Sequence, residues 1–170
     1  MRKSRSVWQK KELRQAMMFL TQYGISMSLA VKIYQEYGPK TYQVVQENPY
    51  RLADDISGIG FKMADEIAGR IGIHTNSDYR IRSGLLYVLL QAAAEGHTCL
   101  PREILLRRAS ELLHVAEEDI EVQMMNLCMD RKLILKEKND QTMVFYSQYY
   151  YMELNTARML HDLNLTCRME

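Results

Sequence analysis

A short stretch with two glycines contains the residues best suited to bind an anion. Gly58 and Gly60 flank one apolar residue, and a helical pattern with Lys62 in its first turn follows at once. Glycines permit a sharp turn and the close approach of another molecule's backbone. Such a turn presents unpaired N–H groups at a helix N-terminus, where the helix dipole favours a phosphate. The candidate residues for phosphate contact are Gly58, Ile59, Gly60, Phe61, Lys62 and Met63.

The helix after the two glycines has an apolar face on which Ala64, Ile67 and Ile71 recur at helical spacing. Ile59 can point into the angle between two helices and keep it closed. The spacing resembles the helix-hairpin-helix motif of DNA-repair proteins, a family that binds a DNA backbone phosphate without sequence preference. The positions that match this motif are Ile56, Gly58, Ile59, Gly60, Ala64 and Ile67. A helical hairpin with a purely structural role is the alternative.

The same pattern occurs 34 residues earlier in the chain. This earlier copy departs from the motif, because Ser26 replaces the second glycine and Ser28 replaces the lysine. We therefore expect it to be a weaker phosphate site or only a scaffold. Its candidate residues are Gly24, Ser26, Ser28 and Lys32. Tandem units of this kind usually form one compact domain, so we predict such a domain at residues 1–74, with repeat units at about 13–38 and 47–72.

Two further cations stand at the start of the next predicted helix, at residues 79–95. Arg80 and Arg82 lie in its first turn, where positive charge opposes the helix dipole at a cost of about 0.3–1 kcal/mol each. An anionic partner would offset this cost, so both arginines are additional candidates for phosphate contact. Exposed arginines paired with Asp78 are the alternative.

The remaining residues, 75–170, follow the order of a winged helix. Three predicted helices precede a β-hairpin at 132–147 that turns at Asn139-Asp140, and a helix at 149–163 comes last. The would-be recognition helix, at 117–131, begins with acidic residues that repel phosphate. We therefore expect this half to be structural or to face a protein. The predicted fold class is mainly α, a tandem helix-hairpin-helix domain followed by a winged-helix-like α bundle with one small β-hairpin.

Positive charge is concentrated at the front of the chain. The net charge is only +1, but residues 1–51 hold nine Lys or Arg against three acids. This asymmetry is typical of a module that touches nucleic acid on one side. A solvated lead-in is the alternative for the first cations, which are Arg2, Lys3, Arg5, Lys10 and Lys11.

Cysteine usage indicates the redox compartment of the chain, and hydropathy indicates whether it contains a membrane-spanning segment. The three cysteines are widely separated and form no C-x-x-C pair, which favours buried thiols in the reducing cytoplasm over a disulfide framework or a zinc site. No apolar run approaches the length that spans a membrane, so we expect no membrane partner.

Nothing in the sequence argues for catalysis. A G-x-x-x-x-G-K-[ST] sequence is absent, and the four histidines are scattered without the spacing of metal ligands. The pair Asp54-Asp55 is better explained as an N-cap before the glycine turn than as a metal site. We therefore expect no catalytic residue, no metal ligand and no cofactor in this segment.

Several segments together resemble one helicase family over most of the chain, from about residue 8 to residue 163. The resemblance is to the N-terminal region of RecD-like (RecD/TraA-type) ATP-dependent DNA helicases, in the long form that acts without RecB and RecC. The segments that carry it include Asn48-Pro49-Tyr50-Arg51-Leu52, Gly58-Ile59-Gly60-Phe61-Lys62 and Arg80-Ile81-Arg82-Ser83-Gly84.

The resemblance implies a function for the parent protein. It would be a five-prime to three-prime helicase, similar to the exodeoxyribonuclease V alpha subunit, in DNA recombination and repair. ATP and Mg would bind only in motor domains that follow this segment, so we expect an excised piece that binds single-stranded or forked DNA without unwinding it. Its partners would be DNA and the motor domains of the same polypeptide. A protein-docking or autoregulatory module without DNA contact is the alternative.

Overall fold

A computed structural model of the chain describes the backbone of residues 2–167 and the side chains of residues 10–161. Arg2, Lys3 and Arg5, for which a solvated lead-in was the alternative to nucleic-acid contact, and the thiol of Cys167 lie outside the described side chains. The chain divides into two compact units, Met1–Arg80 and Ile81–Glu170. The sequence placed this division after residue 74, and the contacts place it after Arg80.

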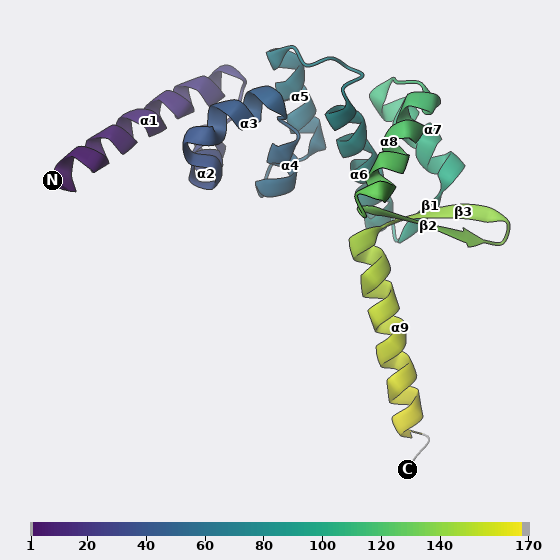
Figure 1. Cartoon of the computed structure of the whole chain (residues 1–170). Helices are drawn as coiled ribbons and strands as arrows, with labels where there is room; N and C mark the ends of the chain where they lie inside the picture. The colour runs from purple at the N-terminus through teal and green to yellow at the C-terminus, as the bar shows by residue number, and fades with distance from the viewer. Residues whose placement is uncertain (1, 168–170) are drawn as a thin grey trace. The chain divides into compact units, whose positions relative to one another are not determined.

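The first unit consists of helices joined by short turns (Figure 1). Its elements are α1 (Arg2–Gln22), α2 (Met27–Tyr37), the 3-10 helix η1 (Gly38–Lys40), α3 (Thr41–Glu47), α4 (Arg51–Asp55) and α5 (Phe61–Ile71). Pro39 lies within η1, and α3 ends directly before Asn48-Pro49, as the conformational limits of proline require. The helix α1 ends at Gln22, directly before the first of the two glycine turns.

The core of the first unit is built from the apolar faces that the sequence predicted. Ala30 and Ile33 of α2 and Ala64 and Ile67 of α5 are fully or almost fully buried. The isoleucines of the two glycine turns, Ile25 and Ile59, are also buried, with exposed fractions of 3% and 4%. Each turn is therefore closed by an apolar side chain beneath it, which fixes the backbone that faces outward.

The second unit has the element order of a winged helix (Figure 1). Its elements are α6 (Asp78–Ala94, which starts within the first unit), β1 (Cys99–Pro101), α7 (Arg102–Leu113), α8 (Glu117–Met129), β2 (Leu133–Lys138), β3 (Gln141–Tyr146) and α9 (Ser147–Cys167). The strands form an antiparallel sheet in the order β1-β3-β2, so the predicted hairpin gains the short β1 along its β3 edge. The mainly α fold class is confirmed.

Local sequence explains the hairpin. Asn139 and Asp140 have φ angles of 52° and 59°, the left-handed pair that a two-residue type I′ turn requires. Val144 of β3 is fully buried and pairs with Leu100 of β1 and Leu135 of β2. The turn that we predicted from Asn139-Asp140 is therefore confirmed, and it places the strands in one register.

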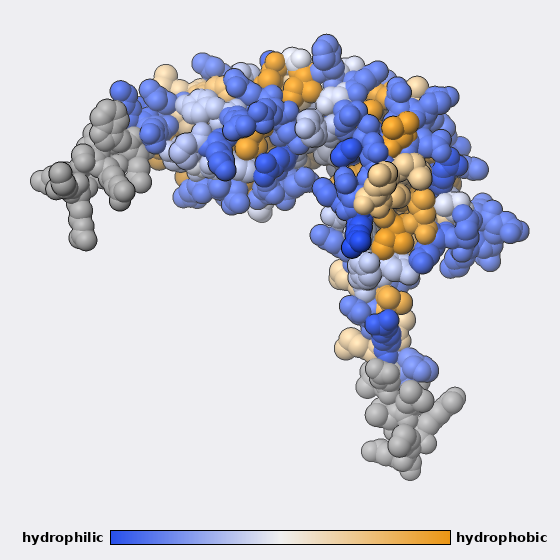
Figure 2. All heavy atoms as spheres, in the orientation of Figure 1, coloured by the Kyte–Doolittle hydropathy of each residue, from blue (hydrophilic) through white to orange (hydrophobic). Residues whose placement is uncertain are grey.

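One helix of the second unit leaves apolar side chains in solvent. Val122, Met125 and Met129 of α8 are 57%, 47% and 79% exposed and lie at helical spacing. Figure 2 shows apolar atoms gathered over the C-terminal part of α8. Within the described part of the chain, every helix is too short or too polar to cross a membrane.

Candidate nucleic-acid interface

The turn between α4 and α5 has a backbone that only glycine adopts readily. Gly58 has a φ of +102°, and a Cβ added there would lie 3.4 Å from Cδ2 of Leu29. Gly60 is the N-cap of α5 in an extended conformation, and both glycines are exposed. We call this turn, residues 57–63, the second corner. Its shape explains why the sequence places glycine at position 58.

Several amides of the second corner point to no acceptor. Gly60 provides no side-chain cap, and the first internal bond of the helix runs from Ala64 N–H to Gly60 C=O at 3.1 Å. The N–H groups of Gly60, Lys62 and Met63 have no hydrogen-bond acceptor among the residues that the structure describes. An anion placed at this helix end would therefore meet donors that the fold leaves unused.

One amide that we predicted for phosphate contact is already engaged. The N–H of Ile59 donates to the C=O of Ile56 at 3.1 Å, and the Ile59 side chain is buried. Phe61 is buried as well and stacks on Tyr50 with ring centroids 6.0 Å apart. Ile59 and Phe61 thus hold the corner from beneath, and its exposed surface is formed by the two glycines, Lys62 and Met63.

Two lysines stand at the second corner, and they come from different helices. Lys62 is exposed in the first turn of α5. Lys32 of α2 donates from Nζ to the C=O of Ser57 at 3.4 Å. The sequence suggested Lys32 as a candidate for the earlier copy of the motif, and the structure brings it to the later one.

The earlier turn, residues 23–29, is the first corner. Gly24 has a φ of +80°, as the repeat predicts. Ser26 is the N-cap of α2, and its Oγ accepts the N–H of Leu29 at 3.4 Å and lies 3.2 Å from Oγ of Ser28. Leu29 occupies the position of Met63 in the repeat, so the amide that is open in the second corner is capped in the first.

A cation that sequence reasoning missed lies over the first corner. The Cζ of Arg70, from α5, is 3.1 Å from the place where a Cβ at Gly24 would stand. The same guanidinium donates to Glu66 at 2.6 Å. The 34-residue repeat gave no signal for this contact, because Arg70 and Gly24 lie far apart in the sequence.

A comparison with known protein families identifies this arrangement. Residues 9–99 match the model of the ATP-dependent RecD2 DNA helicase HHH domain. The chain belongs to this family. The matched range contains both corners and extends through α6 to the first residue of β1.

A polar network supports the second corner of this RecD2 HHH domain from the rear. Asp65 of α5 accepts the hydroxyl of Tyr50 at 2.7 Å and binds Arg80 with two bonds of 2.7 and 3.1 Å. Arg80 also donates to the C=O of Thr75 at 2.9 Å. Burial and the bond to Asp65 raise the pKa of Tyr50, and the bond to Asp65 raises the pKa of Arg80.

The network corrects our interpretation of the two arginines. The charge of Arg80 is offset by Asp65, and the Arg80 side chain is only 12% exposed. Arg82 donates to Oε1 of Gln123 at 2.8 Å and pairs with Asp130 at 3.4 Å. Both arginines serve contacts inside the protein, so we leave them out of the interface.

The aromatic and acidic residues near the corners are also accounted for by packing. Tyr50 is 2% exposed, and Tyr42 lies against Phe19 with ring centroids 4.8 Å apart, so these rings fill space between helices. We predicted Asp54-Asp55 as an N-cap, but the pair ends α4 and caps none of the described helices. Asp55 accepts the hydroxyl of Tyr37 at 2.6 Å. Burial, and then this hydrogen bond, raise the pKa of Tyr37.

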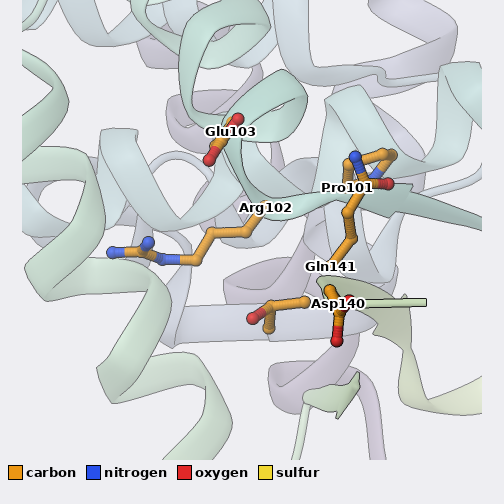
Figure 3. A pocket seen from close by; sticks show the side chains of 6 residues that line it. Pro101, Arg102, Glu103, Asp140 and Gln141 are labelled. Atoms are coloured by element: carbon orange, nitrogen blue, oxygen red, sulfur yellow. The ribbon is translucent and has the colours of Figure 1, made fainter. Parts of the chain in front are cut away.

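The second unit of the RecD2 HHH-domain chain has a small pocket at the start of α7. Figure 3 shows Arg102 beside it, with a guanidinium that points away from Asp140 and Gln141. That guanidinium is paired with Glu121. Within the described residues, no three His, Cys, Asp or Glu side chains cluster as metal ligands would. Burial raises the pKa of the Cys99 and Cys128 thiols, which keeps both in the less reactive protonated form.

Proposed function

We propose that the second corner binds a backbone phosphate of DNA without sequence preference. The chain would then be the DNA-binding accessory region of a RecD2-type helicase that moves five-prime to three-prime and acts in recombination and repair in the cytoplasm, without RecB and RecC. The single observation that carries this proposal is a helix N-terminus where the N–H groups of Gly60, Lys62 and Met63 lack an acceptor among the described residues, in a turn that two lysines adjoin.

The mechanism follows from the geometry of the corner. The N–H groups of Gly60, Lys62 and Met63 donate to the phosphate oxygens, and the α5 dipole adds a favourable field. The ammonium groups of Lys62, in the first turn of α5, and Lys32, bonded to the C=O of Ser57, supply the positive charge. None of these donors reads a base edge, so the contact positions the DNA without selecting its sequence.

The role within the parent helicase is to hold DNA while other domains move it. ATP and Mg belong to the motor domains, and this region contributes a grip on the backbone of a single strand or a fork. A contact restricted to the backbone allows the strand to advance by one phosphate without loss of specific bonds. We expect weak binding by this chain alone, because few phosphates are neutralised.

The salt dependence of binding tests the proposal. Anisotropy of a labelled forked oligonucleotide is measured over a series of salt concentrations. With about two to four phosphates neutralised, the plot of log K against log salt should have a slope of about −2 to −4. A slope near zero, or no binding at low salt, would contradict phosphate contact.

The variant Lys62→Glu tests the corner itself. We expect about tenfold weaker binding to every sequence and a salt slope reduced by about 1, because one phosphate contact is lost. Lys132→Glu, an exposed position in the second unit, carries the same change of charge and is the matched control. Equal losses in the two variants, with circular dichroism showing intact folds, would remove Lys62 from the interface.

A second candidate function rests on α8. Its exposed Val122, Met125 and Met129 follow an acidic first turn, a combination that repels phosphate and suits a protein surface. The second unit would then dock on the motor domains of the same polypeptide. A pull-down with those domains tests this, and Met125→Asp should abolish capture while leaving DNA binding unchanged.

A further inference from the structure

An apolar groove runs along α1 beside the start of α2. Its floor contains Leu13, Met17, Met18 and Met27. Met18 and Met27 are 63% and 60% exposed, although both are large apolar side chains. Exposed methionines are adaptable and recur at surfaces that bind apolar side chains of other molecules. The groove includes Met27 of the first corner and no residue of the second corner.

Two cations line the same groove. Lys10 and Arg14 are exposed and stand one helical turn apart on α1. Like charges at this spacing destabilise a helix by about 0.2–0.5 kcal/mol. No acid among the described residues pairs with either side chain, and the neighbouring Glu12 accepts the hydroxyl of Tyr34 instead. The fold therefore leaves two cations without acidic partners in the described part of the chain, beside an exposed apolar floor.

These two features together select the chemistry of the occupant. A DNA backbone would satisfy the cations, but it would place polar sugar and phosphate groups against the methionines and so bury no apolar partner on the floor of the groove. A neutral apolar peptide would fill the floor and leave the cations without partners. We infer that the groove binds a protein segment in which acidic residues directly adjoin large apolar side chains.

The fit can be stated for each part of such a segment. Its carboxylates accept from Lys10 and Arg14, whose Cβ atoms are about 5–6 Å apart on adjacent turns. Its apolar side chains then lie between Met17, Met18 and Met27 and displace water from them. The proposal does not depend on the second corner, since it uses none of the residues of that corner.

The test uses the full chain and a fluorescein-labelled peptide with a run of Asp followed by Leu and Phe. Two control peptides replace either every Asp by Asn or both apolar residues by Ser. We expect saturable binding of the first peptide and at least about tenfold weaker binding of each control, since each lacks one of the two contacts. The double variant Lys10→Glu, Arg14→Glu should lose binding of the first peptide by a similar factor, and Lys132→Glu should retain it.

The floor is tested by Met18→Ser, an exposed position whose change leaves the core intact. We expect severalfold weaker binding of the peptide and no change in the thermal unfolding midpoint. The proposal is overturned if the peptide fails to bind at millimolar concentration, or if the peptide without apolar residues binds equally well, which indicates general attraction of charge.

Other occupants give different results. Displacement of the peptide by a forked oligonucleotide, with DNA binding also lost in the double variant, would assign the groove to nucleic acid and overturn the proposal. A dimer in light scattering that separates in the double variant would assign the groove to a second copy of the chain and would also overturn the proposal. Because these readouts involve the groove alone, they are distinguishable from a failure of Lys62→Glu to weaken DNA binding.

Discussion

The two corners of the first unit share one backbone shape but use their amides differently. Gly24 and Gly58 both have positive φ, and Ile25 and Ile59 are both buried beneath the turn. The difference lies at the N-cap, where the Ser26 hydroxyl accepts a first-turn amide and Gly60 has no side chain to do so. One side chain thus decides whether that amide stabilises the helix or remains available to a ligand.

The corners also differ in the cations near them. Arg70 lies over the first corner but is bonded to Glu66, which lowers the positive charge that it can offer to an anion. Lys62 has no such acidic partner within the described chain, and Lys32 is bonded only to a neutral carbonyl. The second corner therefore combines open donors with uncompensated charge, and the first combines a capped donor with a neutralised cation.

The largest effect on this contrast should come from Asp65→Ala. Asp65 joins Tyr50 and Arg80 behind the second corner, and its loss leaves a largely buried guanidinium without its main partner. We expect a loss of about 2–3 kcal/mol in the free energy of unfolding, measured in urea. Glu66→Ala removes an exposed pair and should cost less than about 1 kcal/mol. Similar losses of unfolding free energy in both variants would show that the Asp65 network stabilises the protein no more than an exposed ion pair does.

The exchange Gly60→Ser should make the second corner resemble the first. Gly60 is in an extended conformation, and a Cβ there meets no atom within 4 Å, so serine fits without strain. We expect the new hydroxyl to cap the Met63 amide, which raises stability by a few tenths of a kcal/mol and weakens DNA binding about fivefold. The reciprocal Ser26→Gly should lower stability slightly and leave DNA binding unchanged or stronger. Unchanged DNA binding in Gly60→Ser would mean that the Met63 amide does not contact phosphate.

The smallest effect concerns alkaline pH. The pKa of Tyr50 is raised in the folded protein by burial and by Asp65, so folding favours the protonated phenol. This stabilisation is complete below the pKa of an unfolded tyrosine, near 10, and is lost as pH rises above it. Tyr50→Phe should therefore flatten the fall in unfolding free energy above about pH 10. Tyr79→Phe, at an exposed position, is the control, and an equal change in both variants would exclude the Asp65 contact as the cause.

Local patterns predicted most of the fold. The 34-residue repeat located both corners, and Asn139-Asp140 located the hairpin turn, because each depends on residues close together in sequence. The partners of the cations could not be predicted in this way. Asp65 is 15 residues from Arg80, and Ser57 is 25 residues from Lys32, so only the packing of whole helices brings them together.

The same reason explains the remaining differences. The sequence predicted all the amides of the second corner as phosphate donors. The amide of Ile59 is not available for this, because it donates to the C=O of Ile56. Asp54-Asp55 satisfied the composition of an N-cap, but Tyr37 from another helix draws Asp55 into a contact at the end of α4. Residue type indicated which groups could act, and tertiary packing determined which of them are already occupied.

The contacts across the repeat make its halves mutually dependent. Leu29 and Lys32 from the first half complete the turn of the second, and Arg70 from the second half covers the turn of the first. Each half therefore supplies side chains that pack on the turn of the other. The first corner therefore contributes to the shape of the second through Leu29 and Lys32, whether or not it contacts a ligand of its own.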